Sequence, residues 1–173
     1  DTLQSDSKIL TIETGENLIV LDKTPFYPES GGQVSDEGSL EVNHRGIKVK
    51  GAFGELGGVI AHKISDVSPF KVGMTVKATV DSGGRFQTAN HHTATHLLHA
   101  ALREVLGNHV RQSGSLVSPT HLRFDFNHFG PLKDEEIEKI ERLINDKIRE
   151  NIKIETFETS FTEATKMGAV ALF

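Results

Sequence analysis

The first 81 residues are a succession of short runs that favour β-strands, separated by turns that contain glycine or proline. The interruptions include the pairs Gly31-Gly32 and Gly57-Gly58 and the residues Pro25, Pro28 and Pro69. The runs predicted as strands are Lys8–Thr14, Asn17–Asp22, Ser39–Val42, Ile47–Phe53, Gly58–Ile64 and Thr75–Val80. Many short strands joined in this way predict a small, glycine-rich β-barrel or a strongly bent sheet over residues 1–81.

The composition changes at Asp81-Ser82-Gly83-Gly84, and helical spacing of apolar residues begins there. Residues 82–173 are therefore predicted to form a second subdomain. Its expected elements are a helix over Phe86–Leu106 ended by Gly107, a strand over Leu122–Phe126, a helix over Asp134–Asn151, a strand over Lys153–Thr159, and a short helix over Glu163–Phe173 capped by Thr162. This order predicts two layers, helices on an antiparallel sheet, and hence an α+β fold.

The bulk composition places the chain among globular proteins. Its 173 residues are 36% hydrophobic, which is enough for one ordinary domain or two small ones. The absence of cysteine excludes disulfide bonds and fits a reducing compartment. No apolar run approaches the roughly 20 residues that span a bilayer, and no export signal is visible. We expect a cytoplasmic protein with no membrane partner.

The net charge of −5 argues against a protein whose main role is to grip a nucleic-acid backbone. Much of the acidity belongs to the predicted helix that begins at Asp134, which is most simply a solvated surface. A local basic face remains possible near Arg103, Arg111 and Arg123.

Histidines in the segment His91–His99 are the clearest candidate for chemistry. His92 and His96 are four residues apart, so on a helix they project to the same side and can share one metal ion, with zinc the first choice. The apolar stripe of this helix is Ala94, Leu97, Leu98, Ala101, Leu102 and Val105. His92, His96 and His99 are expected opposite the stripe, toward solvent or a cleft.

These histidines have two other interpretations. They can be ordinary polar residues on a wet helix face, which is a common role of histidine. A zinc peptidase requires a glutamate directly after the first histidine of the pair, and position 93 is threonine, so that activity is excluded.

Three blocks resemble the editing region of the alanyl-tRNA synthetases. They are Thr24-Pro25-Phe26-Tyr27-Pro28-Glu29-Ser30-Gly31-Gly32-Gln33, the helix His92-Thr93-Ala94-Thr95-His96-Leu97-Leu98, and Gly114-Ser115-Leu116-Val117 followed by Leu122-Arg123-Phe124-Asp125-Phe126. The same region is similar to the free-standing AlaX trans-editing proteins and to the second editing domain of threonyl-tRNA synthetase. The resemblance spans nearly the whole chain, and its blocks occur in the family's order.

The resemblance implies hydrolysis of the ester in tRNA(Ala) that carries serine or glycine, with the acceptor end of tRNA(Ala) as partner. A pocket shaped for a methyl group cannot strongly reject glycine or serine, so errors must be removed afterwards. It implies a zinc ion held by His92, His96 and a Cys-x-x-x-His motif, whose ligands we expect beyond residue 173. It assigns Gln112 to the substrate pocket; Thr93 and the backbone of Gly31 and Gly32 are further candidates for contact with the substrate or the tRNA end.

Each of these residues also has a plain structural interpretation. Gln112 could be an ordinary surface residue, Thr93 could cap or pack, and the glycine pair could form a tight turn. The apolar segment from Met167 to Phe173 suggests a fragment truncated at its C-terminus, with the remaining domains of the whole protein as further partners. ATP and Mg²⁺ would belong to the synthetic domain of that protein. The alternatives are a noncatalytic tRNA-docking module and a standalone AlaX-like deacylase.

Overall fold

The computed structural model describes residues 2–54, 58–155 and 157–169. Its contacts divide the chain into two compact units, each with its own hydrophobic core. The first unit contains Asp1–His92 and Ser115–Arg123, and the second contains Thr93–Gly114 and Phe124–Phe173. The predicted boundary near residue 81 follows the last barrel strand, whereas this division lies further along, within helix α1 (Ser82–Leu106).

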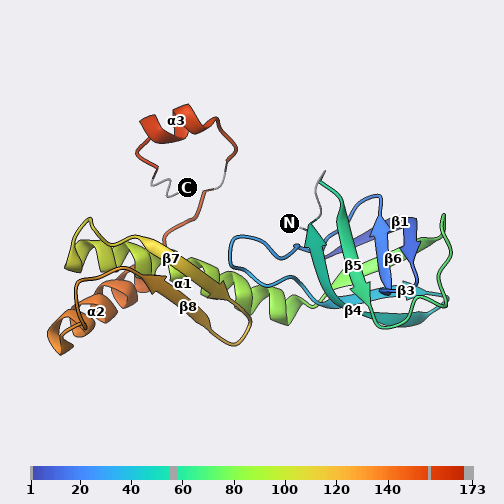
Figure 1. Cartoon of the computed structure of the whole chain (residues 1–173), viewed down its shortest axis with the longest axis horizontal. Coiled ribbons are helices and arrows are strands. Elements are labelled where there is room, and N and C mark those ends of the chain that lie inside the picture. Colours follow the sequence, from blue (N-terminus) through green and yellow to red (C-terminus); the bar gives the residue numbers. More distant parts are fainter. Residues whose placement is uncertain (1, 55–57, 156, 170–173) are drawn as a thin grey trace. The chain divides into compact units, whose positions relative to one another are not determined.

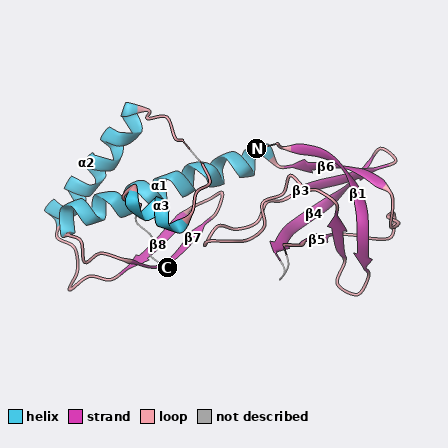
Figure 2. Cartoon of the chain, turned by 90° about the horizontal axis from the view of Figure 1, so that it is seen from above, coloured by secondary structure: helices cyan, strands magenta, loops and turns pink. Residues whose placement is uncertain are grey.

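The first unit is built on a closed barrel of antiparallel strands, which confirms the predicted barrel (Figures 1 and 2). The strands are β1 (Gln4–Glu13), β2 (Leu18–Leu21), β3 (Gly38–Val42), β4 (Arg45–Gly54), β5 (Ile60–Ile64) and β6 (Thr75–Val80). Their order is β1-β2-β5-β4-β3-β6, and β6 pairs with β1 to close the barrel. The strand positions match the prediction apart from shifts at their ends.

Alternation of apolar and polar residues explains how the barrel is filled. In β6, Val76, Ala78 and Val80 are buried while Thr75 and Lys77 are exposed, because successive side chains point to opposite faces of a sheet. Leu40 of β3 lies in register with Ile47 on one side and Ala78 on the other, and all three are buried. The interior of the barrel is therefore a packed core.

The second unit packs helices on a two-stranded sheet, as predicted, but the strand that pairs with Leu122–Phe126 is Gln112–Val117 and not the one expected over Lys153–Thr159. Strands β7 (Gln112–Val117) and β8 (Leu122–Phe126) form a two-stranded sheet, and α2 spans Asp134–Glu150. The core combines residues of α1, the hairpin, α2 and the segments that join them. Its members include Leu98, Ala101, Leu102, Val110, Phe124, Phe126, Ile140 and Ile144.

The helix boundaries follow local chemistry. Gly107 has φ 112°, a conformation that favours glycine, and its N–H bonds to Arg103 O at the end of α1, as predicted. The N-terminus of α2 is closed by Glu136, whose carboxylate accepts the Lys133 N–H at 2.8 Å. Helix α1 begins at Ser82 instead of Phe86, so it includes Gly83 and Gly84. Asp81 stabilises this start, because its carboxylate accepts the Gly83 N–H and its backbone oxygen accepts the Arg85 N–H.

Two predicted elements near the C-terminus need correction. The strand expected over Lys153–Thr159 is wrong for the residues that are described, which form neither strand nor helix. The last helix is α3 (Phe161–Lys166), and Ser160 caps it in place of Thr162, accepting Glu163 N–H at 3.3 Å. The predicted continuation to Phe173 lies partly outside the described residues. The sequence did not predict β7.

None of the described helices has the length and apolar character needed to cross a membrane.

Candidate functional site

A two-residue turn at Gly31-Gly32 folds the loop of residues 24–37 in the first unit back on itself. Ser30 and Gln33 exchange backbone hydrogen bonds of 3.2 and 2.9 Å across the turn. Gly31 and Gly32 have φ of 60° and 80°, which is the conformation required by a type I′ turn and tolerated best by glycine. The tight turn considered from the sequence is confirmed.

The turn is seated against strand β7. A Cβ atom at Gly32 would lie 2.3 Å from Ser115 Oγ and 2.7 Å from Ser115 O, so only glycine allows this close approach. On either side of this contact, Val117 N–H donates to Gly32 O at 2.8 Å and Val34 N–H donates to Val117 O at 3.0 Å. The backbone around Gln33 is therefore fixed by hydrogen bonds to a neighbouring strand.

The side chain of Gln33 reaches the histidine segment of α1. Its Oε1 lies 2.6 Å from Nδ1 of His92, and Gln33 is 7% exposed. The preceding histidine is held as well, because His91 Nδ1 donates to Ser118 O at 2.7 Å. The structure thus places the predicted residues Gly31, Gly32 and His92 in one unit and joins them through Gln33, whose role the sequence did not predict.

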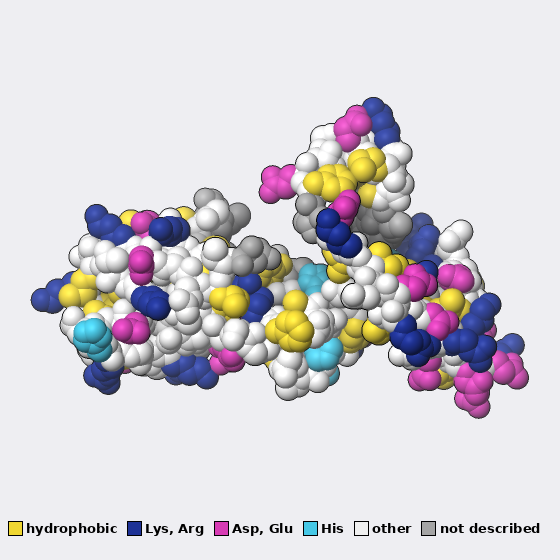
Figure 3. Space-filling view, turned by 180° about the vertical axis from the view of Figure 1, so that it is seen from behind, with side chains coloured by type: hydrophobic (Ala, Val, Ile, Leu, Met, Phe, Trp, Pro, Cys, Tyr) yellow, Lys and Arg dark blue, Asp and Glu magenta, His cyan; other side chains and the backbone are white. Residues whose placement is uncertain are grey.

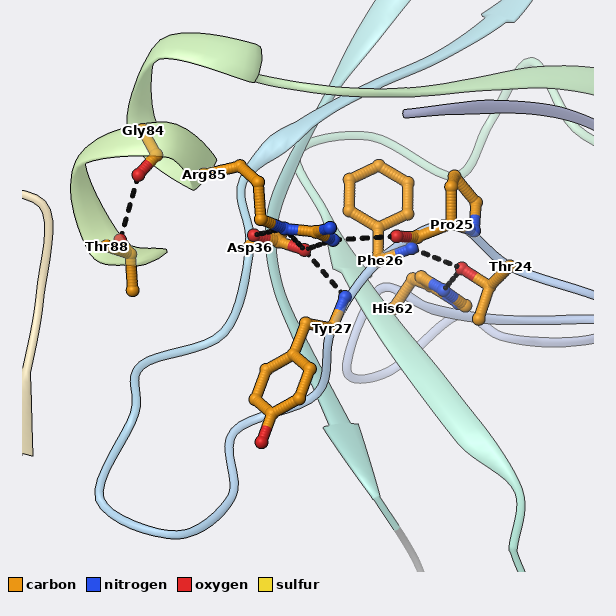
Figure 4. Close-up of polar contacts among 9 residues, drawn as sticks. All are labelled: Thr24, Pro25, Phe26, Tyr27, Asp36, His62, Gly84, Arg85 and Thr88. Atoms are coloured by element: carbon orange, nitrogen blue, oxygen red, sulfur yellow. Dashed lines mark hydrogen bonds and ion pairs between the residues drawn. The ribbon is translucent and has the colours of Figure 1, made fainter. Parts of the chain in front are cut away.

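A buried ion pair fixes the other end of the same loop (Figure 4). Arg85, in the first turns of α1, donates from Nε to both oxygens of Asp36 at 2.9 and 3.0 Å, and its Nη2 bonds to Asp36 as well. Nη2 also donates to Pro25 O at 2.9 Å, while Asp36 accepts Tyr27 N–H at 2.6 Å. The hydrogen bond to Asp36 raises the pKa of Arg85, so the guanidinium keeps its positive charge.

A buried histidine anchors the start of the loop. His62 is fully buried in the barrel, with Nδ1 donating to Ile19 O at 3.0 Å and Nε2 lying 2.7 Å from Thr24 Oγ1 (Figure 4). The Phe26 ring packs edge-on against it at 5.5 Å. Burial lowers the pKa of His62 because the charged imidazolium loses its hydration. The neutral ring, with one donor and one acceptor, satisfies both contacts.

A pocket of about 570 Å³ lies beside this ion pair in the first unit. Its lining mixes acidic side chains, such as Glu29 and Asp81, with the cations Lys50 and Arg85. Charges of both signs are also interspersed over the face of the barrel seen in Figure 3. This unit presents a mixed electrostatic surface, in keeping with the net charge of the sequence.

The remaining predicted site residues belong to the second unit. Thr93 and His96 lie on α1, and Gln112 is the first residue of β7. The prediction that His99 faces solvent or a cleft is wrong. Its ring packs on Phe124 at 5.2 Å and bonds to the Val110 backbone, and burial lowers its pKa. Phe124 of β8 reaches His99 because both lie by the hydrophobic core that α1 shares with the hairpin.

A second cluster of rings was not predicted. His109 Nε2 and His128 Nδ1 are 2.9 Å apart, and their rings stack with centroids 5.2 Å apart. Phe129 stacks on His109 at 4.5 Å and is 89% exposed. Asn127 helps to hold this arrangement, since its side chain donates to His109 O and accepts Arg111 N–H. The result is a stack of three rings in which Phe129 is exposed and the two histidines are half-buried.

The described side chains of metal-ligating type do not gather into a complete metal site. Among residues 2–54, 58–155 and 157–169, no group of three or more histidine, cysteine, aspartate or glutamate side chains could hold a metal ion. His92 and His96 supply two nitrogen donors from successive turns of α1, and both are at least partly exposed. This donor set fits zinc chemically as part of a coordination sphere that needs four ligands.

Comparisons with known proteins agree with the resemblance. The family model described as tRNA synthetases class II (A) matches residues 2–83. The chain is 45% identical to the alanine–tRNA ligase of Acetivibrio thermocellus over 99% of its length, and 51% identical to that of Thermotoga petrophila over 90%. The enzyme of Pseudomonas fluorescens is 46% identical over 93% of the chain.

The chain belongs to the alanyl-tRNA synthetase family. It spans about a fifth of the length of these alanine–tRNA ligases, 20% for the enzyme of A. thermocellus and 18% for that of T. petrophila. The family relationship therefore rests on one region of the relatives, and it is this region that carries the turn and the histidine helix.

Proposed function

We propose that this chain is the editing region of an alanyl-tRNA synthetase and that it hydrolyses the ester of Ser-tRNA(Ala) and Gly-tRNA(Ala). The whole protein would attach alanine to tRNA(Ala) with ATP and Mg²⁺ bound in another domain, and would act in the cytoplasm. The observation that carries the proposal is the contact between Gln33 and His92, which joins the glycine turn to the histidine helix. Such a held imidazole is typical of a metal site.

The proposed cofactor is zinc, bound by His92 and His96 together with ligands of a Cys-x-x-x-His motif that this sequence does not contain. When bound, zinc would polarise the ester carbonyl or lower the pKa of a water molecule. The spacing of the two histidines supports this assignment, since they lie four residues apart on α1 and so project to the same side of the helix.

The chain's own residues would bind and orient the aminoacyl end. We assign Gln112 to the substrate, because its amide both donates and accepts hydrogen bonds and can recognise an amino group or a hydroxyl. Thr93 would add a hydroxyl near the metal ligands, and the backbone at Gly31 and Gly32 would approach the tRNA end, where no Cβ obstructs it. An exposed Gly31 supports this last role, since nothing lies within 4 Å of a Cβ built on it.

A deacylation assay with Ser-tRNA(Ala) tests the proposal. It would compare this chain, a longer protein that joins it to the Cys-x-x-x-His segment, and that longer protein with His92→Ala and His96→Ala, with bound zinc measured on each. We expect zinc and hydrolysis in the longer protein and loss of both in the double variant. Failure of the longer protein to hydrolyse the ester would reject the editing assignment.

A second candidate function is noncatalytic docking of tRNA, and the ring stack of His109, His128 and the exposed Phe129 favours it. Aromatic faces bind unpaired bases with about 1–3 kcal/mol each. In the same set of proteins, Phe129→Ala would weaken tRNA binding without changing bound zinc if the stack docks RNA. Retained tRNA binding by a protein that lacks hydrolysis would favour this second function.

A further inference from the structure

We propose that Gln33 is a positioning residue for His92: its side-chain oxygen holds the imidazole as the Nδ1–H tautomer and thereby makes Nε2 the nitrogen offered to a divalent cation. This inference deepens the proposed function and rests on its assignment of His92 as a metal ligand. The juxtaposition that carries it lies wholly within the first unit.

The tautomer follows from the chemistry of the two partners. The 2.6 Å contact joins His92 Nδ1 to Oε1 of Gln33. A carboxamide oxygen only accepts hydrogen bonds, so Nδ1 must carry the proton. In a neutral imidazole the other nitrogen then holds the lone pair, and a metal ion binds through that lone pair. One hydrogen bond thus decides which nitrogen is the ligand.

The position of the oxygen is fixed by the backbone that carries it. Gln33 ends the Gly31-Gly32 turn and also pairs with Val117 of β7 in an isolated parallel bridge. Gly32 lies so close to Ser115 that no larger residue fits, and Gln33 itself is almost completely buried. A glutamine held in this way cannot turn away from His92 at little cost, as an exposed one could.

The adjacent histidine shows that this orientation is specific to each ring. His91 also uses Nδ1 as its donor, but its acceptor is the backbone oxygen of Ser118 at the end of β7. Two neighbouring rings on α1 are therefore held by two different segments. A substitution of Gln33 should change the tautomer of His92 and leave that of His91 as it is.

Long-range ¹H–¹⁵N correlation spectra of the metal-free chain at neutral pH would measure both tautomers. Wild-type His92 should be mainly Nδ1–H. Free histidine in water prefers Nε2–H, so Gln33→Leu, which keeps the size and removes the acceptor, should move His92 to Nε2–H. Gln33→Glu retains an acceptor and should keep Nδ1–H. Gln87→Leu, at an exposed glutamine elsewhere on α1, is the matched control and should change neither ring.

The proposal is overturned if wild-type His92 is mainly Nε2–H, or if a folded Gln33→Leu variant keeps the wild-type tautomer. Should Gln33→Leu fail to fold, the wild type and Gln33→Glu still decide, because a neutral His92 ring that is mainly Nε2–H in either protein contradicts the proposal. Circular dichroism of each variant establishes whether the fold is retained.

Titration with Zn²⁺ alone adds a second readout. In the wild type we expect the Nε2 resonance of His92 to shift, and in Gln33→Leu we expect zinc affinity to fall about 10- to 100-fold, the usual effect of removing such a partner. A shift at Nδ1, or equal affinities, would contradict the proposal. The tautomer is measured without tRNA or metal, so failure of the deacylation assay would reject the editing function and leave this inference standing.

Discussion

His62 shows how one buried side chain makes the stability of the barrel depend on pH. Its folded-state pKa lies below its usual value of about 6.5 because burial disfavours the charged ring. The unfolded chain therefore binds a proton more readily than the folded one. The resulting stability is complete above about pH 6.5 and is lost as the pH falls from there toward the folded-state pKa.

We predict that His62→Gln flattens the loss of stability between pH 7 and pH 5, measured by urea unfolding at each pH. The variant loses packing and hydrogen bonds, so it should also be less stable than the wild type at pH 7. His44→Gln is the control, because His44 is almost fully exposed on the β3–β4 turn. An equally steep pH profile in His62→Gln would show that other groups cause the dependence.

The ion pair of Arg85 and Asp36 is a second feature of single residues that should contribute strongly to the free energy of unfolding. Removing one partner leaves a buried charge uncompensated, so Arg85→Met should lower the free energy of unfolding by about 3 kcal/mol. Lys48→Met is the control, since Lys48 forms an exposed ion pair with Glu37 and should have a far smaller effect. Similar losses in the two variants, measured by denaturant unfolding, would contradict the prediction.

The role of single residues was the part least accessible from sequence. Gln33 and His92 are 59 positions apart, and Arg85 and Asp36 are 49 apart, so no local pattern indicates that they meet. The pair His92 and His96 could be predicted because its partners lie within one helix turn. His99 was misplaced because helical spacing says nothing about Phe124, which comes from another element.

At the scale of elements, the turn at Gly31-Gly32 allows two properties of glycine to be tested separately: its tolerance of a positive φ and the absence of a Cβ atom. Gly32→Ala would place Cβ within 2.7 Å of the Ser115 backbone at φ 80°, whereas Gly31→Ala meets only the unfavourable φ of 60°. We expect a loss of about 1 kcal/mol for Gly31→Ala and a loss at the upper end of about 1–3 kcal/mol or beyond for Gly32→Ala.

Denaturant unfolding of the two variants side by side would check this order. The Gln33–His92 hydrogen bond should weaken in Gly32→Ala, because the seat of the turn on β7 is displaced. Equal losses would mean that the contact with Ser115 yields easily and does not hold the turn in place.

Elements with strong local patterns were predicted well. The barrel strands alternate clearly, and α2 begins and ends where its acidic first turn and Asn151 indicate. The strand expected over Lys153–Thr159 is absent from the described residues of that segment, and strand propensity stabilises a strand only when a neighbour is available for pairing. Strand β7 was missed because Gln112-Ser113-Gly114-Ser115 has weak strand propensity, and its pairing with β8 decides its conformation.

At the scale of the whole molecule, the two hydrophobic cores should respond separately to cavities. Leu40→Ala removes a fully buried side chain from the barrel, and Ile140→Ala does so in the core of α1, α2 and the hairpin. Each should destabilise its own unit by about 2–5 kcal/mol. Hydrogen exchange should show faster exchange in β3, β4 and β6 for the first variant and in α2 for the second.

Uniformly faster exchange in both units for either variant would show that the chain unfolds as one cooperative body. The sequence supports two cores through its change from strand-like to helical spacing near residue 81. It did not predict that α1 continues from one unit into the other, because a helix that serves two cores has the same spacing as a helix that serves one.

Closure of the barrel limits how other molecules can bind to this unit. Because β6 pairs with both β1 and β3, each of the six strands has a neighbour on either side, and among the described residues of the barrel no strand lies at an open edge. A growing fibril or an extended peptide therefore finds no edge strand of the barrel to which it could add a further strand. Any molecule that recognises the barrel must do so through its loops and side chains. At high protein concentration, the barrel should not aggregate by strand-to-strand pairing.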